Sequence, residues 1–166
     1  MNTGRGSLFR VSSALLFATM QINTSHFGPV EISVDDILLF PRGIIAFEDC
    51  SHWVLLADDA SDALGWLQSV NRPEIALPVV SPRRFVPHYQ VRVTRGQLAP
   101  LDFSQFDEAY VLSILAQSDG DWTLNLKAPL IINFDRRLGR QVITADEQPV
   151  AMEIAPRAPT VLRRSA

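Results

Sequence analysis

Side chains that could perform nucleophilic or metal chemistry are few in this chain, and its histidines stand far apart. There are three histidines, His26, His52 and His88, and a single cysteine, Cys50. No two histidines stand at the short spacing by which metal ligands are recognised in a sequence. Ser69 follows a Trp-Leu-Gln run and lacks the Gly-x-Ser-x-Gly elbow of a hydrolase nucleophile. The sequence therefore predicts no catalytic residue, no metal site and no cofactor.

One enzymatic alternative stays open, because ligands and catalytic groups that are distant in sequence can meet in space. It is a small hydrolase or isomerase with a base, a carboxylate and a hydroxyl drawn from His26, His88, Asp121 and Ser69. Convergence of these side chains in one deep pocket would favour the enzyme. A flat acidic surface without such a pocket would favour a binding protein.

The charge of the chain is unevenly distributed. The 166 residues are 47% hydrophobic and 20% charged, which fits one globular domain with a real core. Residues 1–19 and 157–166 carry five arginines and no acid, so the body keeps ten basic groups against eighteen acidic groups, a net charge of -8. Such a body argues against nucleic acid as a direct ligand and favours a basic protein partner. Plain solubility explains an acidic surface equally well.

The two ends of the chain differ in composition from the body. The apolar run Val11–Ala18 behind Arg5 and Arg10 imitates a short signal peptide, but a start of translation at Met20 is the interpretation we favour. We expect a disordered tail over residues 155–166 and one domain over 20–154. No apolar run approaches the roughly 20 residues that span a bilayer, and a lone cysteine suits the cytosol. The expected location is the cytoplasm, without membrane contact.

Short apolar or alternating runs separated by turn residues fill the body of the chain. The segment Ser118-Asp119-Gly120-Asp121 predicts a hairpin turn between two such runs. Single helical turns are expected at Ser33–Asp36 and Pro82–Phe85. The pattern predicts a mainly β protein, a compact antiparallel β-barrel-like single domain with a few short helical turns, with strands at 52–57, 75–80, 89–93, 109–116, 122–133 and 140–144.

Polar residues within the apolar runs are the candidates for a binding site. Asn125 and Asn133 are eight residues apart and would share one face of a regular strand, unless a bulge at Pro129 breaks it. Pro129 requires this strand to bend or to lie at a sheet edge, where a partner segment could add as a strand. Gln68 and Ser69 follow two apolar residues at a strand end. Both pairs can instead serve as hydrogen-bonded caps of the backbone.

Four ordered segments of the chain resemble FliW, a family of bacterial flagellar assembly factors. Each segment alone is weakly specific, whereas the ordered set, within residues 20–150, is fairly specific. They are Phe40-Pro41-Arg42-Gly43 running on to Phe47-Glu48, Trp66-Leu67-Gln68-Ser69, Pro82-x-x-Phe85-x-Pro87-x-Tyr89, and Asn125–Asn133 followed by Gly139–Ile143.

The resemblance implies an interaction protein with a compact β-barrel-like domain, and no enzymatic activity. Family members bind flagellin and also CsrA, a small dimeric RNA-binding repressor of flagellin translation. The resemblance therefore implies these two partners for this chain, and we expect a monomer. The candidate partner-binding residues are Phe47, Glu48, Gln68, Ser69, Asn125, Asn133 and Gln141.

The chain departs from the family pattern in one loop. The usual Gly-Ile-Pro-Gly-Phe-Glu is replaced by Gly43-Ile44-Ile45-Ala46-Phe47-Glu48, which loses a proline and a glycine. Proline fixes φ and glycine permits positive φ, so the change alters the conformational freedom of this loop.

Overall fold

The fold is described for residues 18–155 of a computed structural model. The expectations for the N-terminal extension and for the C-terminal tail fall outside this range, apart from Ala18, Thr19 and Ala155. The first strand begins at Thr19, which pairs with Ser33, and the backbone N–H of Val34 donates to the Ala18 carbonyl at 2.9 Å.

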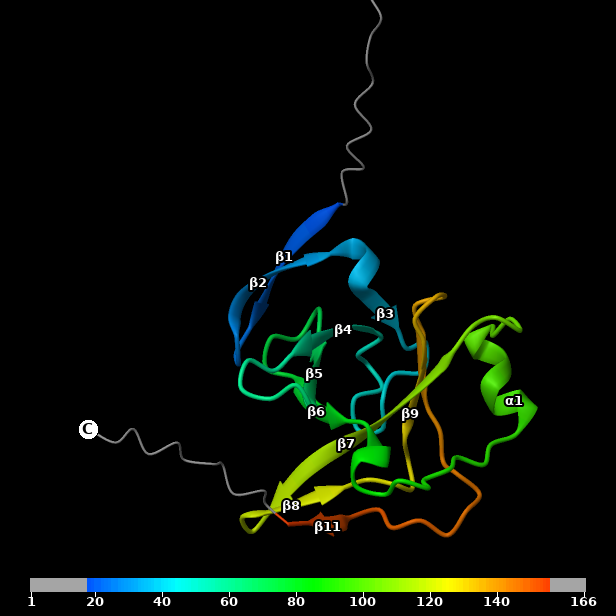
Figure 1. The fold of residues 1–166 in the computed structure, drawn as a ribbon. Coiled ribbons are helices and arrows are strands. Elements are labelled where there is room, and N and C mark those ends of the chain that lie inside the picture. Colours follow the sequence, from blue (N-terminus) through cyan, green and yellow to red (C-terminus); the bar gives the residue numbers. More distant parts are fainter. Residues whose placement is uncertain (1–17, 156–166) are drawn as a thin grey trace, which may run out of the picture.

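Strands are the predominant regular structure of the described chain, as Figure 1 shows. They are β1 (Thr19–Thr24), β2 (Gly28–Ser33), β3 (Ile37–Leu39), β4 (His52–Ala57), β5 (Leu64–Ser69), β6 (Ala76–Val80), β7 (Ala109–Ser118), β8 (Asp121–Leu124), β9 (Leu130–Asn133), β10 (Leu138–Gln141) and β11 (Met152–Ile154). The helical segments are short: η1 (Val34–Asp36), η2 (Pro82–Arg84), α1 (Arg95–Leu98) and η3 (Ala99–Leu101). No helix within residues 18–155 is long and apolar enough to cross a membrane.

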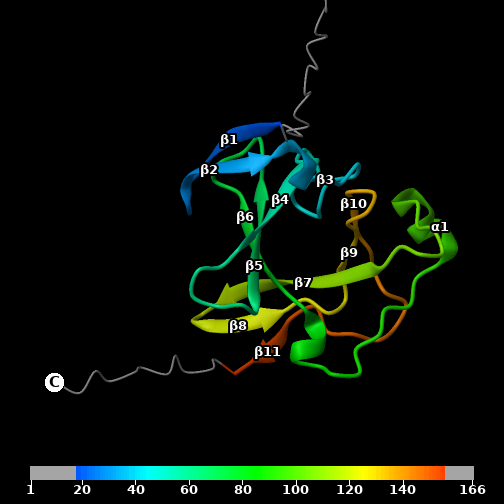
Figure 2. The ribbon, with the colours of Figure 1, turned by 45° about the horizontal axis from the view of Figure 1, so that its top comes forward.

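Seven strands close into a barrel. The order is β7-β6-β5-β4-β3-β10-β9, and β9 pairs again with β7 to complete the ring. In Figure 2, β5 and β6 rise from β7 on one side and β9 and β10 on the other. All pairings are antiparallel except β3 with β10, which meet through Leu39 and Leu138. The β1–β2 hairpin lies at one end, and β8 and β11 extend the sheet at the other (Figure 1). The predicted mainly β, barrel-like domain is confirmed.

The core lies inside this ring, and β9 is buried on both faces. Trp53, Phe40 and Ile132 are fully buried in the main cluster. Ile131 on the opposite face of β9 packs against Leu101 of η3 instead. Burying one large apolar side chain stabilises the fold by about 1.5–3 kcal/mol, so a strand covered on both faces is a rigid support for the turn that leaves its C-terminal end.

Local signals in the sequence predicted several elements correctly. The β7–β8 hairpin turns through Asp119 and Gly120 at positive φ, 54° and 92°, as the type I′ turn requires. Ser33 caps η1, and the Asp36 carboxylate completes the capping box by accepting from the Ser33 backbone at 3.2 Å. Pro78 lies on a stretch of β6 that pairs with β5 alone, since pairing with β7 begins at Val79.

Two strand predictions were wrong. Residues 89–93 alternate in burial, yet they form no strand, and the pairing there is limited to Arg92 with Thr144 and Ala145. The expected strand over 122–133 is two strands, because the chain leaves the sheet between β8 and β9. The second of these is no edge, since β9 is flanked by β7 and β10. Alternation reports which side faces the core, whereas pairing requires a neighbour that no local pattern specifies.

Candidate partner-binding surface

The loop between β3 and β4 makes a tight turn at Ile44–Phe47. The Phe47 N–H donates to the Ile44 carbonyl at 2.7 Å, and Ala46 has φ of 73°. A positive φ at the third position defines a type II turn, which favours proline at the second position and glycine at the third. The Pro-Gly of the family pattern fits these two positions, and Ile45-Ala46 adopts the same turn here with a strained alanine.

Gly43 fixes the base of this turn. Its φ is +64°, and a Cβ atom there would lie 2.5 Å from the Glu48 Cα atom. Any other residue would therefore push the two arms of the loop apart. The Glu48 carboxylate closes the turn from the other side, since its Oε1 accepts from the Ala46 N–H at 3.0 Å.

Gln141 ties the tip of the loop to the barrel. Its Oε1 accepts from the Ile45 N–H at 2.8 Å, and its Nε2 donates to the Ala128 carbonyl at 3.0 Å. The Ala128 N–H in turn donates to Asn125 Oδ1 at 2.9 Å. The family's proline would have no N–H to give, so the Ile45–Gln141 bond depends on the residue that replaces it.

This network presents one apolar side chain to solvent. Ile45 is 56% exposed, although its backbone is held in place. Phe47 points the other way and packs edge-to-face on Trp53, with ring centroids 6.5 Å apart. Phe47 therefore anchors the loop, and Ile45 is the side chain that a partner would meet first.

A small cleft lies beside the loop, and its charge is basic. It has a volume of about 170 Å³ and is lined by Pro41, Arg42, Gly43, Pro100, Leu101, Gly139, Arg140 and Gln141. The Arg140 guanidinium donates to the Gln97 carbonyl at 2.6 Å, which fixes it at the cleft wall. Two arginines at one small cleft make it poorly suited to a basic partner.

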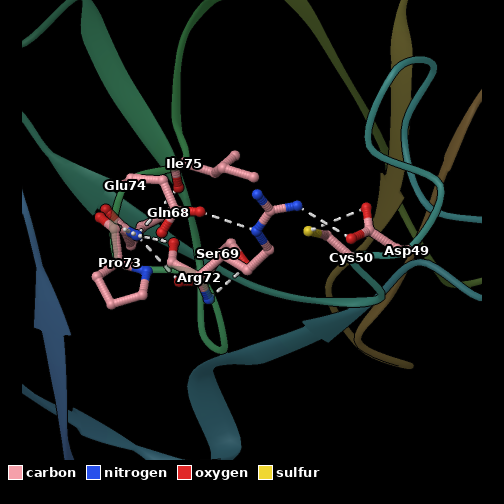
Figure 3. Close-up of polar contacts among 8 residues, drawn as sticks. All are labelled: Asp49, Cys50, Gln68, Ser69, Arg72, Pro73, Glu74 and Ile75. Atoms are coloured by element: carbon pink, nitrogen blue, oxygen red, sulfur yellow. Dashed lines mark hydrogen bonds and ion pairs between the residues drawn. The ribbon is translucent and has the colours of Figure 1, made fainter.

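Gln68 and Ser69 hold the β5–β6 turn together, as Figure 3 shows. Gln68 is fully buried, and its Nε2 donates to the carbonyls of Ser69 and Ile75 at 2.9 and 3.0 Å. Ser69 Oγ accepts from the Arg72 N–H at 3.2 Å. Neither side chain reaches the surface, so these contacts support the backbone-capping interpretation. Arg72 also pairs with Asp49 at 3.0 Å, which links this turn to the β3–β4 loop.

Asn133 is buried at a corner away from the loop. Its Nδ2 donates to the Leu101 carbonyl at 3.0 Å and to Asp107 at 3.1 Å, and its Oδ1 accepts from the Arg136 N–H at 3.2 Å. The backbone and hydroxyl of Ser104 and the Asn133 amide together lower the pKa of Asp107 to about 2. Asn133 and Asn125 do not share a strand face, because the chain between them leaves the sheet.

The residues of the enzymatic alternative lie on separate elements. Ser69 is buried against Arg72, and His26 packs on Trp66 in the β1–β2 turn with ring centroids 4.2 Å apart. Asp121 begins β8, and His88 is exposed in the segment before α1. The linings of three clefts in the described part of the chain, of about 410, 430 and 170 Å³, include none of the four. Residues 18–155 also contain no cluster of three or more potential metal ligands.

The sequence analysis did not identify two residues of this surface: Ile45, which is exposed at the loop tip, and Arg72, which links the β5–β6 turn to the loop. Ile45 could have been found from its position in the turn, where a side chain projects outward. Arg72 had no signal, because it meets Asp49 across 23 residues of sequence. The structure thus joins Asn125, Gln141, Phe47 and Glu48 in one loop network, and assigns Gln68, Ser69 and Asn133 to the support of buried backbone.

Comparison with known proteins gives one consistent result. The family model described as FliW protein matches residues 21–154. A flagellar assembly factor FliW of Bdellovibrio bacteriovorus is 39% identical over 129 residues, covering 76% of this chain and 74% of that protein. One of Natranaerobius thermophilus is 35% identical over 127 residues, covering 75% and 84%.

A solved structure agrees with this result. The crystal structure of a flagellar assembly factor FliW superposes with a TM-score of 0.76 at 30% identity, covering 84% of this chain and 99% of that one. The family match extends from β1 to β11 and includes the barrel and the β3–β4 loop. This chain belongs to the FliW family of flagellar assembly factors.

Proposed function

We propose that this protein regulates flagellin synthesis by binding two partners in turn, flagellin and a CsrA-type translational repressor. The observation that carries the proposal is the family match over residues 21–154, nearly the whole described domain. The activity is binding without catalysis, and it takes place in the cytoplasm, where the repressor meets its messenger RNA.

The mechanism is mass action between two ligands of one domain. Free flagellin occupies the protein and leaves the repressor to act on the messenger RNA. When flagellin is exported, the protein is released and sequesters the repressor, so translation resumes. The fraction of repressor bound then depends on the free concentrations of both partners and on their dissociation constants.

Flagellin is the partner that best suits the β3–β4 loop. Exposed Ile45 offers an apolar contact on a backbone held by Gln141, and a pre-organised contact loses less entropy on binding. Arg42 and Arg140 beside it would repel a basic protein. The repressor, as the basic partner, is attracted instead by the body with its net charge of -8 over residues 20–156.

Calorimetric titration of the purified full chain with each partner from the same bacterium tests the proposal. We expect one repressor protomer per protein and an affinity that falls as salt rises, because the Debye length shrinks from about 30 Å at 0.01 M to about 8 Å at 0.15 M. Flagellin binding should depend less on salt. Absence of binding to both partners would refute the function, and repressor binding unaffected by salt would refute the electrostatic argument.

A further inference from the structure

An apolar groove crosses the end of the barrel away from the β3–β4 loop. It consists of two clefts of about 410 and 430 Å³, and both are lined by Leu55 and Leu56 of β4. The first cleft continues over Val79 and Leu112 towards Arg84. The second is walled by residues of β2, η1, β3 and the turn after β9, which include Ile32, Leu38, Phe134, Asp35, Asp36 and Arg137.

The floor of the groove is a strand whose C-terminal end has one edge without a partner strand among residues 18–155. β4 pairs with β5 through Ala57, whereas its pairing with β3 ends at Val54. In an antiparallel ladder alternate residues bond to opposite neighbours. The backbone N–H of Asp58 donates to the Leu64 carbonyl, on the β5 side. Val54 and Leu56 lie at alternate positions before Asp58, so their backbone groups also point towards β5. Leu55 and Ala57 therefore direct their N–H and C=O groups towards the groove, where β3 no longer extends.

The rim of the second cleft is acidic. Glu31, Asp35 and Asp36 line it against one basic residue, Arg137. Arg137 is already engaged, since its guanidinium donates to Asp35 Oδ1 at 2.6 Å. Glu31 and Asp36 are left to attract positive charge from outside.

Aromatic rings extend the apolar surface at the same end. Phe134 is 37% exposed and Tyr110 is 44% exposed, and their rings meet edge-to-face at 4.8 Å. Two carboxylates lie close to Tyr110: its hydroxyl donates to Glu108 Oε2 at 3.3 Å, and Glu108 first, and then burial and Asp135, raise the pKa of Tyr110. Exposed aromatic side chains beside carboxylates make an apolar surface selective for basic sequences.

We propose that an extended segment of the basic partner docks in this groove and adds to β4 as a further strand. Its main chain pairs with Leu55 and Ala57, its apolar side chains enter the two clefts, and its lysines or arginines meet Glu31 and Asp36. The identity of the partner as the CsrA-type repressor rests on the proposed function, whereas the surface rests on the groove itself. Flagellin and the repressor then bind at opposite ends of β3, which is only three residues long, so that one bound protein sterically excludes the other.

Strand addition fits this site better than a docked helix. A helix satisfies its own backbone and would leave the Leu55 and Ala57 groups at the groove without protein partners. A strand supplies those partners and places alternate side chains on opposite sides, one row in the groove and one towards the rim.

The test is calorimetric titration of the full chain with the repressor in three variants. Glu31→Lys/Asp135→Lys reverses charge at the groove, and Asp121→Lys/Glu153→Lys makes the same change on β8 and β11. None of these four carboxylates makes a side-chain hydrogen bond or ion pair within residues 18–155, so folding should be preserved in both. Ala57→Pro removes an N–H that faces the groove while leaving the β5 ladder intact, as edge strands allow.

We expect the groove reversal and Ala57→Pro each to weaken repressor binding at least about tenfold, with flagellin binding unchanged and the control reversal within about twofold of wild type. Wild-type repressor affinity in both groove variants would overturn the inference and leave the proposed function standing. If the wild type does not bind the repressor, an eight-residue peptide of alternating lysine and valine is titrated instead. Peptide binding that is abolished by Ala57→Pro would support the inference, and absence of peptide binding would overturn it. Repressor binding that strengthens when residues 1–17 are removed would assign the groove to that segment of the chain. Self-association that is abolished by Ala57→Pro would assign the groove to a second copy of the protein. Either result would overturn the inference.

Discussion

The β3–β4 loop and the corner after β9 each depend on a hydrogen-bonded amide side chain, and they use it in opposite ways. At the β3–β4 loop, Gln141 holds a backbone that displays Ile45 at 56% exposure. At the corner after β9, Asn133 is fully buried and links Leu101, Asp107 and Arg136. The same chemistry presents a surface in the first region and joins segments of the core in the second.

An amide within an apolar run is therefore not evidence for a binding site until its burial is known. A buried amide that loses its partner leaves a backbone carbonyl unsatisfied, and this costs stability. An amide that accepts from an exposed loop should cost little stability when removed, yet it controls the shape of that loop. Variants in the two regions should therefore separate folding from binding.

The largest effect is expected at the buried corner. Asn133→Ala should lower the free energy of unfolding by about 3 kcal/mol, because the Leu101 carbonyl and the Arg136 N–H lose their side-chain partners. Urea unfolding measures this, and the flagellin affinity of the folded fraction should match wild type. A stable Asn133→Ala protein with lost affinity would reverse the assignment of the two regions.

A smaller effect of opposite sign is expected at the loop. Ala46 has φ of 73°, a conformation that costs a non-glycine residue about 1–2 kcal/mol. Ala46→Gly should raise the free energy of unfolding by about 1 kcal/mol, after the greater freedom of glycine in the unfolded chain is subtracted. Ala60→Gly, in the loop between β4 and β5, is the control and should not raise the free energy of unfolding, because Ala60 has no positive φ. An Ala46→Gly protein less stable than wild type would contradict the strained turn.

The smallest expected effect is on the pH dependence of stability at the buried corner. Asp107 has a folded-state pKa of about 2 against an ordinary value of 3.8, so its contribution is present above about pH 4 and disappears as pH falls towards 2. Asp107→Asn should flatten the fall of the thermal midpoint over that interval. Asp121→Asn, whose carboxyl makes no side-chain hydrogen bond within residues 18–155, should follow wild type. Parallel profiles for wild type and Asp107→Asn would exclude the role of Asp107.

How far the sequence predicted the structure depends on the distance over which each signal acts. The strand 52–57, the Asp119-Gly120 turn and the Ser33 cap were correct because each is set by neighbouring residues. The interior position of β9 was missed, because its neighbours β7 and β10 are chosen by closure of the barrel.

The candidate site was predicted only in part for the same reason. The resemblance identified Gln141 and the loop at 43–48, but nothing in the sequence joined Gln141 to Ile45 across 96 residues. The even spacing of Asn125 and Asn133 misled, since it holds only for a continuous strand. Local patterns thus supplied the residues, and the fold decided which of them face solvent.

The claim that flagellin binds the exposed Ile45 side chain is tested most directly by titrating flagellin into the Ile45→Ser variant, with Val150→Ser as the control. Both isoleucine and valine are exposed, at 56% and 65%, so both variants should unfold like wild type. We expect Ile45→Ser to weaken flagellin binding at least about tenfold, about 1.4 kcal/mol, while Val150→Ser has no effect. Equal flagellin affinity in wild type and a folded Ile45→Ser protein would contradict the claim that this loop is the binding surface.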